Sequence, residues 1–131
     1  MTALVLDAGA LIALDRGDRS MWARLRAASD AGDIVAVPTG VIAQAWRGGR
    51  GQAQLARALV HCHEVVLDGA VARASGRLCG RTGTNDIVDA SVAVAAAHFA
   101  PVERTVVATS DADDIEALTA ALNTQVNILR V

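Results

Sequence analysis

The sequence predicts a three-layer α/β domain in which helices flank a central, mainly parallel sheet of five strands. Five short runs of apolar, often β-branched residues alternate with longer segments whose apolar residues recur at helical spacing. The short runs lack polar alternation, which is typical of strands buried on both faces of a parallel sheet. The chain has 131 residues, the length of one domain, so we expect residues 1–131 to fold as a single unit.

The expected strands are the apolar runs of the chain. They cover residues 3–6, 34–37, 65–67, 105–108 and 126–131. Pro38 follows the second run directly and is expected to end it. The regular alternation of these runs with helical segments favours a β-α-β architecture.

The intervening segments predict helices. After a short helix that begins near residue 9, helices are expected over residues 18–31, 39–47, 52–62, 70–79, 85–99 and 111–122. Thr39 is expected to cap the third of these seven helices, and Thr84 or Asn85 the sixth. Gly48 and Gly49 are expected to end the third helix. Leu11, Leu14 and Trp22 in the early helices fit either core packing or a surface for a second copy or a partner protein.

Composition excludes several function classes. The net charge is −2, so any binding of nucleic acid needs a local arginine cluster or bridging metal ions. All twelve basic residues are arginine, and the absence of lysine rules out Schiff-base chemistry and a P-loop. The aromatic residues are only Trp22, Trp46 and Phe99, too few for a platform on which bases stack.

The chain is expected to be cytoplasmic. Its first residues lack the basic charge of a signal peptide, and Asp7 interrupts their apolar run. No run approaches the ~20 apolar residues of a membrane span. Cys62 and Cys79 form no C-x-x-C pair and are expected to be reduced thiols.

Four aspartates are expected to meet at one edge of the sheet. Asp7 follows the first strand, Asp111 follows the fourth, and Asp86 and Asp89 lie three apart at the start of a long helix. In an open parallel sheet, ligands bind beyond the carboxyl ends of the strands, where the strand order switches. The four positions therefore predict a carboxylate cluster.

A divalent cation would relieve the mutual repulsion of such carboxylates. Ligands that are all oxygen suit Mg²⁺ or Mn²⁺, and these ions support phosphoryl chemistry by activating water and neutralising charge. The competing interpretation is that each aspartate only caps a helix or favours its dipole. Asp113, Asp114 and Glu116 fit that interpretation best, although Asp114 is also a candidate for the periphery of the site.

The chain resembles the PIN-domain ribonucleases, and in particular the VapC toxins of toxin–antitoxin pairs. Four segments carry the resemblance over nearly the whole chain, and their order and spacing are more specific than any one of them. They are Val5-Leu6-Asp7-Ala8-Gly9-Ala10-Leu11-Ile12, Val37-Pro38-Thr39-Gly40-Val41-Ile42-Ala43-Gln44-Ala45-Trp46, Thr84-Asn85-Asp86-Ile87-Val88-Asp89-Ala90 and Val107-Ala108-Thr109-Ser110-Asp111.

The resemblance implies a Mg²⁺- or Mn²⁺-dependent endoribonuclease of PIN-like fold, homodimeric and held inactive by a cognate antitoxin. It implies that Asp7, Asp86 and Asp111 are catalytic metal ligands, that Asp89 is a further ligand, and that Thr109 supports the site.

Gln44 departs from the family pattern, because that position normally carries a glutamate of the metal site. A Gln side chain keeps a carbonyl oxygen but loses the negative charge. We expect weaker metal binding than in a Glu-bearing relative, with partial compensation by Asp89. The departure leaves open a catalytically weak or silent module that binds RNA or antitoxin.

The remaining features give weaker hypotheses. Arg47 and Arg50, in a glycine-rich loop, and Arg81 are candidates for contacts with RNA phosphates, or else are solvated arginines. His61, Cys62 and His63 lack a second Cys/His pair at zinc spacing. A phospho-acceptor receiver domain also places acids at strand ends, but the missing lysine argues against it.

Overall fold

A computed structural model describes residues 1–131 and contains one sheet of five strands. The strands are β1 (Thr2–Leu6), β2 (Ile34–Pro38), β3 (His63–Val65), β4 (Arg104–Thr109) and β5 (Asn127–Arg130), and every pair of neighbours is parallel. The helices are α1 (Ala8–Asp15), α2 (Arg19–Asp30), α3 (Thr39–Ala45), α4 (Ala53–Leu59), α5 (Gly69–Thr82), α6 (Ile87–Phe99) and α7 (Ala112–Ala121), with a 3₁₀ turn at Arg50–Gln52 before α4. The predicted three-layer α/β fold is confirmed.

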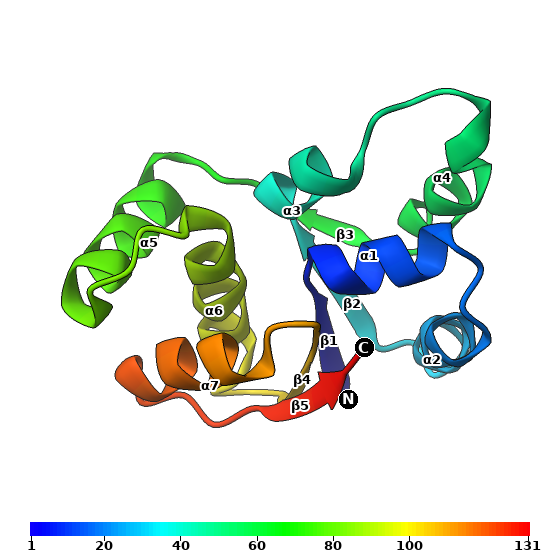
Figure 1. Ribbon diagram of the computed structural model, residues 1–131. Coiled ribbons are helices and arrows are strands. Elements are labelled where there is room, and N and C mark those ends of the chain that lie inside the picture. The colour runs from blue at the N-terminus through cyan, green and yellow to red at the C-terminus, as the bar shows by residue number, and fades with distance from the viewer.

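The helices divide between the two faces of the sheet (Figure 1). Helices α1, α2 and α4 lie together on one side, and α5, α6 and α7 lie on the other, with the sheet seen nearly edge-on between them. This division follows from right-handed crossovers, because the chain moves from β1 to β3 in one direction and from β3 to β5 in the other.

The strand order β3-β2-β1-β4-β5 places the topological switch between β1 and β4. These two strands pair over five residues, from Thr2 with Arg104 to Leu6 with Ala108. The residues that follow β1 and β4 therefore start from adjacent points at the same edge of the sheet. This is where an open α/β sheet forms its ligand site.

The core is built from small and branched apolar side chains. Ala3, Val5 and Leu6 of β1 are fully buried, as expected of a central strand covered by helices on both faces. Leu11 and Leu14 of α1 are also fully buried. These two leucines therefore belong to the core, and the hypothesis that they form a surface for a partner is wrong.

Strand β3 lies two residues earlier than expected, at His63–Val65 instead of 65–67. As an edge strand it pairs only with β2, with His63 opposite Ala36 and Val65 opposite Pro38. His63 and Glu64 are exposed. The prediction followed the apolar run at residues 65–67, but an edge strand needs few apolar residues.

The expected helix caps were wrong at two positions. Thr39 is the first residue of α3, and its hydroxyl accepts a hydrogen bond from the Leu67 backbone N–H instead of capping the helix. Helix α6 is capped by Asp86 and not by Thr84 or Asn85. The carboxylate of Asp86 reaches the third backbone N–H of that helix, the usual geometry of an N-cap.

Three helix ends also differ from expectation, and one of them is that of α5, which runs to Thr82 instead of residue 79. Helix α3 ends at Ala45, before the glycines, because Trp46 is already extended. The expected helix over residues 52–62 is shorter, since α4 covers Ala53–Leu59 only. No helix of the structure has the length and the apolar content needed to cross a membrane.

Candidate functional site

Asp7 lies at the switch between β1 and β4 and is held there by hydrogen bonds on both carboxylate oxygens. Its Oδ1 accepts from the backbone N–H of Ala10 at 3.0 Å, and its Oδ2 accepts from that of Ser110 at 3.2 Å. Its own N–H donates to Ala108 O at 3.1 Å. The side chain is almost fully buried, so these bonds fix the position of the carboxylate.

Gly9 allows the start of α1 to approach the loop after β4. A Cβ atom at this position would lie 2.6 Å from the Cβ of Ser110 and closer still to its hydroxyl. No larger residue fits without moving the loop. The close approach brings the segment after Asp7 against the segment that carries Asp111.

Asp111 has a free carboxylate on a fixed backbone. Its N–H donates to the hydroxyl of Thr109 at 2.8 Å, and Thr109 is fully buried. The Asp111 side chain is exposed and makes no capping bond to α7. Thr109 therefore fixes the backbone position of this acid.

Asp86 and Asp89 stand at the first turn of α6. Oδ1 of Asp86 accepts from the N–H of Asp89 at 2.9 Å, and the Cys79 thiol contacts the carbonyl of Asp86 at 3.7 Å. Asp86 is exposed and Asp89 is half-buried. The helix that presents both acids packs against β1, β2 and β4, which brings them to the switch.

The electrostatics of Asp89 show that the acids gather around it. The pKa of Asp89 is raised from 3.8 to about 6, mainly by burial and then by the negative charges of Asp86, Asp111, Asp7 and Asp114. None of these five acids forms an ion pair. The structure thus brings together all four aspartates expected at this edge of the sheet, with Asp114 beside them.

The donor set fits a hard divalent cation, because the four aspartates offer only carboxylate oxygens. The side chains as they stand do not form a ready ligand group of three or more His, Cys, Asp or Glu residues. Asp7 and Asp86 instead direct oxygens to backbone N–H groups. Each oxygen that accepts one such bond keeps a lone pair for a cation.

Gln44 is exposed on α3 and makes no hydrogen bond to any of the four acids. Helix α3 packs against α6, and Gly40 faces Val88 there, with 3.6 Å from its Cβ position to a Val88 methyl group. The helix that carries Gln44 therefore contacts the helix that carries Asp86 and Asp89.

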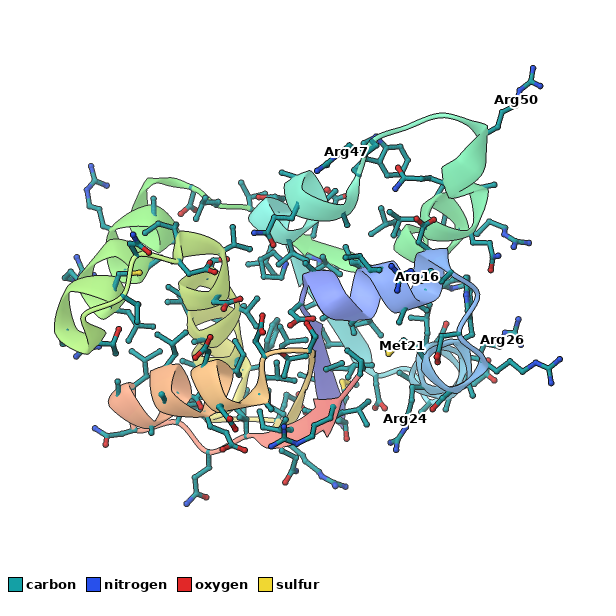
Figure 2. The ribbon with its side chains drawn as sticks, viewed as in Figure 1. Arg16, Met21, Arg24, Arg26, Arg47 and Arg50 are labelled. Atoms are coloured by element: carbon teal, nitrogen blue, oxygen red, sulfur yellow. The ribbon has the colours of Figure 1, made fainter.

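The arginines expected to bind phosphates do not form one cluster. Arg47 and Arg50 belong to the loop between α3 and α4, where Figure 2 shows Arg50 extending away from the fold. Nη1 of Arg47 donates to the carbonyls of Ala43 and Trp46, at 3.2 and 2.7 Å. Arg81 lies in α5, on the other face of the sheet.

Gln52 organises this loop, a role that no sequence pattern indicated. Its Oε1 accepts from the N–H groups of Arg47 and Gly48, at 2.6 and 2.8 Å. Its Nε2 donates to Ala45 O at 2.8 Å and to Asp15 at 3.3 Å. Gly48 and Gly49 have φ values of 82° and 89°, the left-handed conformation that glycine adopts readily.

The His61-Cys62-His63 segment forms no metal-binding group. The Cys62 thiol donates to Ala58 O at 3.4 Å. Burial, and secondarily the charge of Glu64, raises the pKa of Cys62 to about 12, so the thiol stays protonated at neutral pH.

Comparison with known proteins supports the fold. No protein-family profile matches the chain, and no curated protein sequence matches it. Among solved structures, the chain is similar to a chain of VapBC2 from Rickettsia felis, crystallised with a DNA fragment from the promoter of the pair. The alignment covers 98% of both chains with a TM-score of 0.65 at 12% sequence identity.

At that identity the similarity establishes the architecture, which is a three-layer α/β fold. It agrees with the central parallel sheet of five strands expected from the sequence, and the similarity extends over 98% of the chain.

Proposed function

We propose that the protein is a divalent-metal-dependent endoribonuclease and acts as the toxin of a toxin–antitoxin pair. The observation that carries the proposal is the convergence of Asp7, Asp86, Asp89 and Asp111 at the switch between β1 and β4. The fold shared with a chain of VapBC2 supports the same assignment.

In this proposal Asp7, Asp86, Asp89 and Asp111 hold Mg²⁺ or Mn²⁺. A bound ion of this kind lowers the pKa of water and stabilises the charge that develops on a phosphodiester during hydrolysis. The chain itself positions the carboxylates that would hold the ion. Ala10 and Ser110 fix the carboxylate of Asp7 through their N–H groups, and Thr109 fixes the backbone of Asp111.

The charge of the site depends on whether Asp89 is protonated. Because its pKa is raised to about 6, Asp89 takes up a proton as pH falls through that value. Proton uptake lowers the negative charge that faces an approaching phosphodiester, but it also removes a ligand. The site is therefore expected to work best above pH 6, where Asp89 is charged.

The partners belong to the same proposal. The neighbour in structure is a VapBC2 pair, which supports a cognate antitoxin as the partner of this chain. We extend the proposal to a homodimer that acts in the cytoplasm on RNA.

The test is cleavage of total RNA by antitoxin-free protein in Mn²⁺ or Mg²⁺, with EDTA and the Asp86→Asn variant as controls. Discrete fragments that disappear in both controls support the proposal. Binding of RNA or antitoxin without cleavage, by folded protein in either ion, would overturn it in favour of a catalytically silent module marked by Gln44.

A further inference from the structure

A basic hollow opens between α2 and α4, on the face of the sheet opposite α6. It has a volume of about 580 Å³. Its lining includes Gly17, Arg19, Trp22, Arg26, Gln54 and Arg57. No acidic side chain lines the hollow, and none of the residues of the acidic site does.

The three arginines of the hollow have no carboxylate partner. None of Arg19, Arg26 and Arg57 forms an ion pair in the structure. They come from two helices, α2 and α4, so tertiary packing and not sequence proximity brings them together. Like charges gathered without a counter-charge repel one another, and an anion bound between them would remove that repulsion.

The wall of the hollow is held in place by the aromatic ring of Trp22. Its Nε1 donates to Leu14 O at 2.9 Å, and the guanidinium of Arg26 lies 5.6 Å from the ring centroid. At the rim, Gly17 has a φ of 74°, and its Cβ position lies 3.1 Å from the amide of Gln54. At least one arginine is thus oriented before any ligand arrives.

We infer that this hollow binds backbone phosphates of RNA, as an anchoring site separate from the acidic cluster. The guanidinium fork matches phosphate oxygens in bidentate geometry. The chemistry of the acidic site points the same way, because a chain of net charge −2 with converging carboxylates repels RNA at the point of cleavage. A bound metal ion offsets part of this repulsion, and arginines away from the acidic site add affinity; the hollow gathers three of them.

The choice of RNA as the ligand rests on the proposed function, so the test measures binding and not cleavage. A labelled single-stranded RNA of about 12 nucleotides, within the site sizes usual for such binding, is titrated in EDTA by fluorescence anisotropy. The Arg19→Gln/Arg57→Gln variant is compared with Arg73→Gln/Arg104→Gln. Both double variants remove two exposed arginines and change the net charge equally, but Arg73 and Arg104 lie outside the hollow.

The hollow variant is expected to bind RNA at least tenfold more weakly, and the control variant within about threefold of the parent. The dependence of log affinity on log salt concentration should flatten by about 1.4 for two lost phosphate contacts. The Arg19→Lys/Arg57→Lys variant keeps the positive charges but loses the bidentate guanidinium groups. Its RNA affinity should lie between those of the two Gln variants. This variant also serves if the Gln variant does not fold.

Equal losses in the two Gln variants would overturn the inference, because only overall charge would then matter. A polyglutamate peptide provides the second arm. If its binding depended on the hollow and RNA binding did not, the hollow would be a site for an acidic protein segment. Cleavage by the parent protein in Mn²⁺ is scored separately, so failure of the nuclease proposal and failure of the phosphate site give different results.

Discussion

The backbone N–H of Ser110 donates a 3.2 Å hydrogen bond to the Asp7 carboxylate, across 103 positions of the chain. The bond joins the segments that follow β1 and β4, the two strands on either side of the switch. A buried carboxylate bonded in this way cannot reorient freely. The carboxylate of Asp7 is therefore held in one position at the edge of the sheet. The acids at the start of α6 and in the loop after β4 lie near it.

The first prediction concerns the close packing at Gly9. Gly9→Ala is expected to destabilise the protein by about 1–3 kcal/mol, because the added methyl group overlaps Ser110. Urea unfolding measures the effect. Gly76→Ala is the matched control, since nothing lies within 4 Å of that position in α5, and it should gain up to about 1 kcal/mol.

Relief of the overlap gives a second comparison. Adding Ser110→Gly to Gly9→Ala removes the nearest atoms and should recover part of the lost stability relative to Ser110→Gly alone. If Gly9→Ala proved as stable as the parent, the loop after β4 would not be packed against α1 as described.

The second prediction concerns Gln52. Gln52→Ala removes four hydrogen bonds that tie the loop after α3 to Ala45 and Asp15, and is expected to cost about 1–2 kcal/mol. Hydrogen exchange at the N–H groups of Arg47 and Gly48 should accelerate. Gln125→Ala is the control, because Gln125 is exposed and its side chain makes no hydrogen bond. Unchanged exchange at both groups would show that the loop is held by other contacts.

The third prediction is a pH dependence of stability set by Asp89. Its pKa is raised from 3.8 to about 6 in the folded protein, so between these values the folded state keeps a proton that the unfolded state has lost. Its contribution to stability therefore falls as pH rises through this window. In EDTA, Asp89→Asn should melt close to the parent at pH 4 and at a higher temperature at pH 7.

The exposed Asp30, at the end of α2, provides the control for this experiment. Asp30→Asn should change the melting temperature by similar amounts at both pH values. A difference between Asp89→Asn and the parent that did not grow with pH would contradict the electrostatic environment described for Asp89.

The fourth prediction concerns Gln44 and the proposed metal. Gln44→Glu is expected to tighten Mn²⁺ binding, since it adds a carboxylate on the helix that contacts α6. A tenfold lower Kd would add about 1.4 kcal/mol of stabilisation at saturating Mn²⁺, visible as a further rise in melting temperature of a few degrees. Gln125→Glu makes the same change of charge away from the site. If the two variants responded equally to Mn²⁺, position 44 would have no part in metal binding.

The sequence predicted the parts of the fold that depend on local pattern. Apolar runs located four of the five strands within one residue at each end. Three of these four are the interior strands β1, β2 and β4, which are covered on both faces and therefore apolar throughout. Strand β3 was misplaced, because it is an edge strand that pairs only with β2, and its exposed residues His63 and Glu64 need not be apolar. Caps were misassigned at Thr39 and before α6, where the path of the chain decides which side chain reaches a free N–H.

The sequence by itself determined that Asp7, Asp86, Asp89 and Asp111 would meet, because the β-α-β order dictates which strand ends lie at one edge. Only the tertiary structure decided how they meet. It determines which carboxylate oxygens accept hydrogen bonds from backbone N–H groups, and it places Asp89 where burial and four neighbouring charges raise its pKa. It alone also decided that Gln52 holds a loop and that Arg19, Arg26 and Arg57 share a hollow. The physical reason is range: backbone periodicity acts between near neighbours, whereas hydrogen bonds and charges act between whatever side chains packing brings together.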